Sequence, residues 1–138
     1  MTAINKFLRT PFAGTAAYVG ACNIELDFTK QSVTSSDLVN ICTIPKGTIV
    51  IKVAARVETG EGSSITSTFG DSGGVATWMA TGPNLQTADN HAVSLVGDTN
   101  AGCKYYVADD TLTLSVSGTV SAAKLYVTVL YAREPHYT

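Results

Sequence analysis

The chain is poor in charged residues, in aromatic residues and in cysteine. Of its 138 residues, 14% are charged, 8% are aromatic and three are cysteine. So few charges are unusual for a protein whose whole surface faces water, and we expect a partner to cover part of that surface. The net charge is −2, and the nine basic residues are scattered along the chain. Because a basic stripe is missing, nucleic acid is not an expected partner.

Signals for membranes and secretion are also missing. No apolar run approaches the roughly 20 residues that a membrane-spanning helix needs. The segment 7–17 is interrupted by Arg9 and Pro11 and lacks the continuous apolar core of a secretion signal. No Asn-x-Ser/Thr sequon occurs. We therefore expect synthesis in a cytoplasm and no membrane partner.

The cysteines Cys22, Cys42 and Cys103 are odd in number and have no short pair spacing. This pattern favours reduced, small apolar side chains over a disulfide. The chain is also long enough to bury roughly two thirds of its unfolded surface in one domain. No metal, disulfide or cofactor is therefore expected to be needed for folding.

What the sequence does contain is a two-residue rhythm, clearest at 48–58. One set of alternate residues comprises Ile49, Ile51, Val53, Ala55 and Val57, and the other comprises Thr48, Val50, Lys52, Ala54, Arg56 and Glu58. Strict alternation predicts an amphipathic β-strand with the first set facing inward. The rhythm returns at 23–28, 111–117 and 124–132, and no window sustains a helical period. The sequence therefore predicts an all-β protein.

Turn residues divide the chain into about eight or nine strands. The predicted strands are 16–21, 23–28, 39–44, 48–58, 65–69, 92–96, 104–107, 111–117 and 124–132. Pro45, Lys46 and Gly47 suit a tight reversal, so 39–58 is predicted to be a hairpin. Residues 35–38 can form one helical turn at most. The expected architecture is an antiparallel two-sheet sandwich of jelly-roll type.

The N-terminal residues differ in character from the rest. Residues 1–15 show no alternation, and we predict an extended arm before a single β-sandwich domain at 16–138. The candidate partner-binding residues of the arm are Phe7, Leu8, Arg9 and Phe12. Such an arm either packs back on its own domain or docks on a neighbour.

A second irregular segment covers 77–90. Trp78 and Met79 lie there, close to Gly82 and Pro83, and the pattern predicts a long loop. Tryptophan and methionine are enriched in the centres of protein interfaces. Trp78 and Met79 are therefore further candidate partner-binding residues.

The glycine-flanked Ser72 in the segment 70–74 looks like a hydrolase nucleophile. A chymotrypsin-like enzyme has its histidine before the serine, but His91 and His136 both follow it. Ser72, Asp89 and His91 have the order of an α/β-hydrolase, but that fold is not expected here. The segment therefore predicts a glycine-rich β-turn and no enzyme activity.

Metal and sugar binding are the remaining possibilities for a site. Loop residues with oxygen or nitrogen ligands are Asp71, Asp89, His91, Asp98, Asp109 and Asp110. They do not have the spacing of a calcium loop or a zinc site, so no metal is expected. Jelly rolls often bind sugars, and Trp78, Tyr105 and Tyr106 have flat faces for a sugar ring. Adjacent tyrosines on a strand point to opposite sides, so one of the two is expected in the core.

A wider resemblance rests on a succession of strands and turns. The matching segments are 24–30, 44–48, 56–59, 69–71, 108–112 and 127–131. In this order they resemble small structural proteins of tailed bacteriophages, in particular the capsid cement or decoration proteins. Similar sandwiches occur in phage tail and fibre components, so a carbohydrate-binding tail or fibre component is the alternative.

The resemblance implies a mechanical function in the virion. The protein would be made in the host cytoplasm, bind the major capsid protein and stabilise the assembled head shell. Such proteins often form homo-oligomers, with a trimer favoured, at the symmetry axes of the shell. The arm from Phe7 to Phe12 would then lie on the shell or on a neighbouring protomer.

Overall fold

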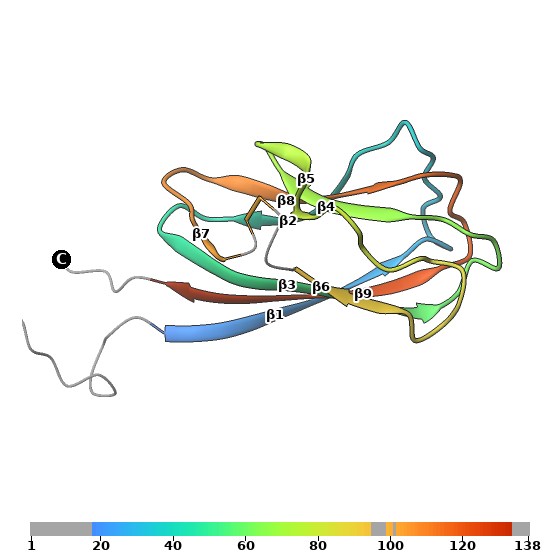
Figure 1. The fold of residues 1–138 in the computed structure, drawn as a ribbon, viewed down its shortest axis with the longest axis horizontal. Helices are drawn as coiled ribbons and strands as arrows, with labels where there is room; N and C mark the ends of the chain where they lie inside the picture. Colours follow the sequence, from blue (N-terminus) through green and yellow to red (C-terminus); the bar gives the residue numbers. More distant parts are fainter. Residues whose placement is uncertain (1–17, 95–98, 101, 134–138) are drawn as a thin grey trace, which may run out of the picture.

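The computed structural model describes residues 18–94, 99–100 and 102–133 (Figure 1). Its strands are β1 Tyr18–Asp27, β2 Val39–Ile44, β3 Thr48–Thr59, β4 Ser67–Asp71, β5 Gly74–Met79, β6 His91–Val93, β7 Lys104–Tyr105, β8 Asp110–Val116 and β9 Lys124–Arg133. No helix occurs among these described residues, and the all-β prediction is confirmed. At 35–38 the chain makes only a turn, in which the Asp37 N–H donates to the Thr34 carbonyl at 3.1 Å.

The strands form two sheets that lie as two layers in Figure 1. One sheet has the order β1-β9-β3-β6, with β7 also paired to β3, and the other has the order β2-β8-β4-β5. The strand pairs of the described chain are antiparallel. Setting β7 aside, successive strands alternate between the sheets, except that β4 and β5 are neighbours in one sheet. This alternation is the jelly-roll order, so the predicted sandwich is confirmed.

The prediction that 39–58 is a hairpin is wrong. The bounds of β2 agree with the prediction, and β3 runs one residue further than predicted. However, β2 pairs with β8, and β3 pairs with β9 in the other sheet. The turn between them therefore carries the chain across the sandwich. Each strand has one apolar face, and placing the two strands in opposite layers buries both faces in the same core.

Tertiary hydrogen bonds hold this crossing turn. Gly47 adopts a φ of 83°, a conformation that favours glycine, and its N–H donates to the Tyr106 carbonyl at 2.8 Å. The Lys46 N–H donates to the Asp109 carboxylate at 2.8 Å. Both acceptors lie about 60 residues further along the chain, a separation that local turn signals do not encode.

The inward face of β3 changes part-way along the strand. Its pairing with β9 slips between Val50 and Lys52. Because a one-residue slip exchanges the two faces of a strand, the inward positions change from even to odd numbers. The buried residues of β3 are Thr48, Val50, Val53, Ala55 and Val57. The prediction that Ile49 and Ile51 face the core is therefore wrong, since both are only half-buried.

Strand β1 replaces the two separate strands expected at 16–21 and 23–28. It pairs without interruption along β9, from Tyr18 opposite Arg133 to Asp27 opposite Lys124. Ile24 and Leu26 are half-buried, and Phe28 beyond the strand is buried, so this side of β1 faces the core.

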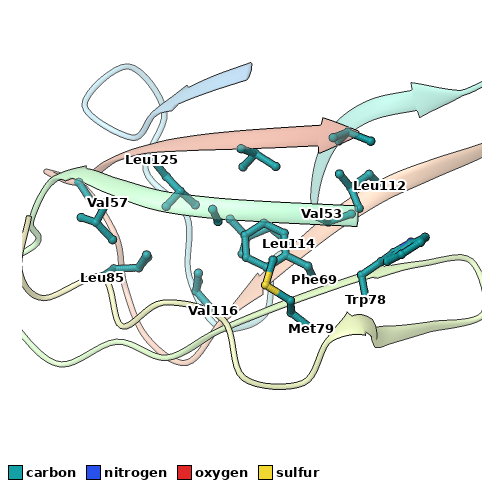
Figure 2. Close-up of a cluster of buried hydrophobic side chains, with 14 of the residues drawn as sticks. Val53, Val57, Phe69, Trp78, Met79, Leu85, Leu112, Leu114, Val116 and Leu125 are labelled. Atoms are coloured by element: carbon teal, nitrogen blue, oxygen red, sulfur yellow. The ribbon is translucent and has the colours of Figure 1, made fainter. Parts of the chain in front are cut away.

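The core fills the space between the sheets (Figure 2). Val53, Val57 and Leu125 come from the first sheet, and Phe69 and Met79 come from the second. Phe69 and Met79 are opposite each other on β4 and β5, and both are fully buried. Further core residues include Leu85, Leu112, Leu114, Val116, Val120 and Val127. Burial of these side chains is the main stabilising contribution to the fold.

Candidate functional site

Trp78 and Met79 are not surface residues. Residues 77–79, the start of the expected loop at 77–90, are the end of β5, and both side chains have 0% exposure. Figure 2 shows them among the buried side chains between the sheets. Gly82 and Pro83 come after the strand, so the loop that they indicate begins only after Met79. In this structure the two side chains stabilise the core and present no surface to a partner.

A buried polar network surrounds Asp71 at the end of β4. Its Oδ2 atom accepts hydrogen bonds from the Tyr106 hydroxyl at 2.7 Å, from Lys104 Nζ at 2.8 Å and from Asn100 Nδ2 at 3.1 Å. Its Oδ1 atom accepts from Thr77 Oγ1 at 3.0 Å and from the Gly73 N–H at 2.8 Å. The Asp71 side chain has 0% exposure, and that of Lys104 has 32%. The network ties the residues around β7 to the β4–β5 turn.

The electrostatics of this network keep Asp71 charged. Burial raises the pKa of Asp71, but the hydrogen bonds from Lys104, Tyr106, Gly73 and Thr77 lower it further than burial raises it. The pKa of Tyr106 is raised, first by burial and then by the hydrogen bond to Asp71. Both groups therefore hold the protonation state that the hydrogen bonds require, and the network joins β4, β5 and β7 through Asp71.

Ser72 lies in the predicted glycine-rich turn, which joins β4 and β5. Its hydroxyl donates to Asp110 Oδ2 at 2.7 Å, and its N–H donates to Asp110 Oδ1 at 3.1 Å. Burial raises the pKa of Asp110, and hydrogen bonds from Ser72 and Thr111 more than offset that effect, so the pKa is lowered. The two hydrogen bonds to Asp110 tie the β4–β5 turn to the start of β8.

The other two members of the hydrolase-like order lie elsewhere. His91 begins β6 in the opposite sheet, and its Nδ1 is 3.0 Å from the Asp89 carbonyl oxygen. The Asp89 carboxylate pairs with Arg56 at 3.1 Å on the exposed surface. His136 lies outside the described residues. The structure thus does not bring Ser72, Asp89 and His91 together.

The candidate metal ligands do not converge in the part of the chain that the structure describes. Within that part, no three His, Cys, Asp or Glu side chains form a group that could hold a metal ion. Asp109 accepts a hydrogen bond from the Lys46 N–H in the crossing turn. Asp98 lies outside the described residues.

The aromatic side chains proposed for sugar binding are also separated. Tyr106 has 2% exposure and accepts a hydrogen bond from the Trp78 indole N–H at 2.9 Å. Tyr105 points the other way and has 45% exposure. One tyrosine in the core and one outside was the prediction, and it is confirmed. With Trp78 and Tyr106 buried, the structure offers no shared aromatic platform for a sugar ring at these three positions.

Exposed apolar side chains gather at one end of the sandwich, beside the crossing turn. Val107 has 80% exposure, and Tyr105 is close to it in the chain. A hollow of about 730 Å³ there is lined by Pro45, Lys46, Gly47, Tyr105, Val107, Asp109 and Arg133. We call this surface the turn-end patch. Sequence reasoning missed it, although the alternation at 104–107 places Tyr105 and Val107 on the same side.

A second hollow of about 630 Å³ lies over the outer face of the first sheet. Its lining includes Arg56, His91, Val93, Tyr126 and Thr128. The Arg56 guanidinium lies 5.5 Å from the centre of the Tyr126 ring, as in a cation–π contact. Because Arg56 also pairs with Asp89, its charge is already partly satisfied within the chain.

The cysteines are free thiols in the structure, and their surroundings differ from the apolar core positions that were expected. Cys22 and Cys103 are exposed, and Cys42 is half-buried. Burial, followed by the proximity of Cys22, raises the pKa of Cys42 to about 11. At neutral pH the Cys42 thiol is therefore protonated and weakly reactive.

The arm residues Phe7, Leu8, Arg9 and Phe12 and the boundary at 15–16 lie outside the described residues. The described chain begins with β1, which forms one edge of its sheet. β2 forms an edge of the other sheet. Edge strands carry backbone donors and acceptors that a further strand can pair with, so β1 and β2 are candidate assembly edges.

The described residues contain no helix with the length and apolar character needed to cross a membrane. A scan of protein-family models finds no match, and a search of curated proteins finds none either.

Solved structures of the same fold come from phage capsids. A chain of the cyanophage Pam1 capsid asymmetric unit matches with a TM-score of 0.69 and 19% identity, over 96% of this chain and 97% of that one. A chain of the Ralstonia phage GP4 capsid matches with a TM-score of 0.64 and 17% identity, over 96% and 95%. A chain of the acid-stable capsid of Helicobacter pylori bacteriophage KHP30 matches with a TM-score of 0.60 and 18% identity, over 91% and 97%. The resemblance to phage structural sandwiches therefore extends to the fold of nearly the whole chain.

Proposed function

We propose that this protein is a structural component of a phage virion, of the capsid cement or decoration type. The observation that carries the proposal is the match of nearly the whole chain to chains of similar size in three phage capsids. The low charge of the chain fits a protein that is partly covered in its assembly. Its partner in this proposal is the major capsid protein.

The turn-end patch is the proposed contact surface within the described residues. Fully burying an exposed valine side chain stabilises a contact by about 1.5–3 kcal/mol. Val107 has 80% exposure, and Tyr105 beside it exposes a further 45% of its surface. Lys46 and Asp109 at the rim supply polar groups, as is usual around an apolar contact. The arm residues Phe7, Leu8, Arg9 and Phe12 add a second contact, on the shell or on a neighbouring protomer.

A homo-oligomer, with a trimer favoured, would strengthen this binding. Each protomer makes a modest contact, and linking several protomers raises the effective concentration of the remaining contacts. A ring at a symmetry axis of the shell satisfies this condition.

The test is saturation binding of the purified protein to shells of the major capsid protein from the same phage. We expect saturable co-sedimentation, on the order of hundreds of copies per shell, and a shell that withstands more heat. Val107→Asp should weaken binding at least about tenfold, because it places a charge in the contact. The matched control is Val75→Asp, at an exposed valine of β5 outside the patch.

Other results would contradict the proposal. Saturation at about a dozen copies, or binding to tails and not to shells, would place the protein in the tail. Binding to glycans of the host surface without binding to shells would favour the carbohydrate-binding alternative. Equal binding by the Val107→Asp and Val75→Asp variants would remove the turn-end patch as the contact, even if shell binding itself is found.

A further inference from the structure

Strand β1 is a long edge of the first sheet (Figure 1). It has 10 residues, and its pairing with β9 contains no bulge. Edge strands of natural proteins are usually short, bulged, or protected by lysine or proline, and β1 contains neither of these two residue types. Its two charged residues, Glu25 and Asp27, lie at its C-terminal end. An edge with these properties is suited to pairing with another strand.

The register with β9 shows which backbone groups of β1 lie on this edge. Just beyond the strand, and in the same register, the Phe28 N–H donates to the Ala123 carbonyl at 3.0 Å. Because backbone groups alternate between the two sides of a strand, the even-numbered residues of β1 bond to β9. The odd-numbered residues direct their N–H and C=O groups to the edge. Consistent with this alternation, the Asp27 carbonyl accepts the Lys30 N–H at 3.2 Å and does not bond to β9.

The four odd-numbered residues from Val19 to Glu25 are matched to a second copy of the same strand. Two copies related by a twofold axis pair antiparallel, and opposite residues must face the same side of the joined sheet. If Cys22 lies opposite its own copy, Val19 is opposite Glu25 and Ala21 is opposite Asn23. Each of these four residues then exchanges both backbone hydrogen bonds with the residue opposite. A shift of two residues in either direction would leave Val19 or Glu25 opposite a residue outside this set.

Length and charge also favour a second β1 as the partner strand. The remaining edges of the described sheets are formed by β2, β5, β6 and β7, and each of these strands has at most 6 residues. Like charges directly opposite each other destabilise a strand pair, and this register places Glu25 opposite Val19 and away from its own copy. Val19 has 67% exposure, so the contact also covers exposed apolar surface.

We propose that two copies of this chain join through β1, antiparallel about a twofold axis at Cys22, so that their first sheets form one continuous sheet. The contact uses the same surface on both copies, and a ring about a threefold axis leaves such a contact free to link neighbouring rings. The pairing does not depend on the proposed function, because it is a property of the isolated protein.

A disulfide at the twofold axis tests the pairing and its register. Cys22 and its copy form a pair without hydrogen bonds between them, with Cα atoms about 4.5 Å apart, which suits a disulfide. The chain with Cys42→Ser and Cys103→Ser is incubated with oxidised glutathione. The two Cys22 thiols each lose a hydrogen to form one S–S bond, and glutathione disulfide is reduced to two glutathione molecules. We expect a disulfide-linked dimer.

The matched control moves the single cysteine to position 19. It carries Val19→Cys and Cys22→Ser in the same background. Position 19 is exposed, so random collisions reach it, but the proposed pair separates its two copies by about 20 Å. The control should therefore form the linked dimer at least about tenfold more slowly, because its effective concentration is lower.

A proline substitution tests the pairing without oxidation. The Ala21 N–H lies on the edge, so Ala21→Pro removes no hydrogen bond to β9 but blocks the second copy. Under reducing conditions, sedimentation should show that the mass of the native species doubles as its concentration rises. Ala21→Pro should weaken this association at least about tenfold, and Ala21→Ser, which keeps the N–H, should leave it unchanged. Circular dichroism checks that each variant is folded, and the crosslinking comparison decides if Ala21→Pro does not fold.

Other results would overturn the inference. Equal crosslinking from positions 19 and 22 would mean that collisions, and no fixed pair, form the bond. Doubling of mass that folded Ala21→Pro retains would place the contact on another surface. Protection of the Val19, Ala21 and Asn23 amides from hydrogen exchange in a species of constant mass would mean that the chain covers this edge itself. Shell binding is measured separately, and none of these results bears on it.

Discussion

The Tyr106 hydroxyl donates a hydrogen bond to Asp71 Oδ2 at 2.7 Å, and both residues are nearly inaccessible to water. The same hydroxyl oxygen accepts the Trp78 indole N–H at 2.9 Å. One hydroxyl therefore satisfies a buried donor and a buried acceptor at once. This arrangement makes Trp78 part of the core and links it to the charge of Asp71.

The substitution Tyr106→Phe should destabilise the fold by about 2 kcal/mol. The substitution keeps the ring but leaves the Trp78 N–H and one Asp71 interaction without a partner in a buried site. Urea unfolding followed by tryptophan fluorescence measures the change. Tyr105→Phe, at the exposed neighbour, is the control and should cost less than about 0.5 kcal/mol. Equal losses in the two variants would contradict the role of the buried hydroxyl.

The substitution Asp71→Asn should lower the unfolding free energy at neutral pH and make it depend less on pH in the acid range. The pKa of Asp71 is lowered in the folded protein, so the carboxylate stabilises the fold above its ordinary pKa of about 3.9. That contribution is lost as the pH falls through the folded-state pKa. The difference in unfolding free energy between wild type and variant should therefore shrink in this acid range. The exposed Asp89→Asn variant is the control, and parallel curves for wild type and Asp71→Asn would contradict the prediction.

The substitution Glu61→Gln should destabilise the fold by about 1–2 kcal/mol. The Glu61 carboxylate accepts the N–H groups of Ser121, Ala122 and Ala123 at 2.8–3.0 Å, next to the start of β9. Burial raises the pKa of Glu61, but these backbone hydrogen bonds lower it further, so the charged form is preferred. An amide has one acceptor oxygen and cannot serve all three groups equally. Hydrogen exchange at 121–123 should accelerate, and unchanged exchange would contradict the prediction.

Val50 and Ile51 provide a test of the slip in β3. Val50→Ala should cost about 2 kcal/mol because Val50 has 1% exposure and lies in the core. Ile51→Ala removes more atoms but should cost less than about 1 kcal/mol, since Ile51 is only half-buried. Urea unfolding of both variants gives the comparison. The reverse order of stability would mean that the simple alternation at 48–58 is right and the slip is absent.

Local patterns predicted the positions of most strands. The 39–44 strand has the bounds of β2, and 124–132 differs from β9 by one residue. Alternation and turn residues report on neighbours a few residues away, which is sufficient to locate a strand. They do not report on its partner, and this is why 39–58 was expected to be a hairpin. The slip at Ile51 was missed for the same reason, since it exists only in the pairing with β9.

The candidate site depends still more on the tertiary structure. Trp78 looked like a surface anchor because Gly82 and Pro83 follow it, and the residue that covers it, Tyr106, is 28 positions away. Asp71 was considered as a metal ligand, but Lys104, Asn100 and Tyr106 already occupy its Oδ2 atom. The turn-end patch likewise combines residues that are far apart in the chain.

A period of two residues and frequent turn residues are enough to specify an all-β sandwich, because they are compatible with no other regular structure. Which apolar residues form the core and which remain exposed depends on how the two sheets face each other, because burial is a relation between the sheets. Trp78 and Val107 are both apolar, yet one has a facing layer to pack against and the other does not.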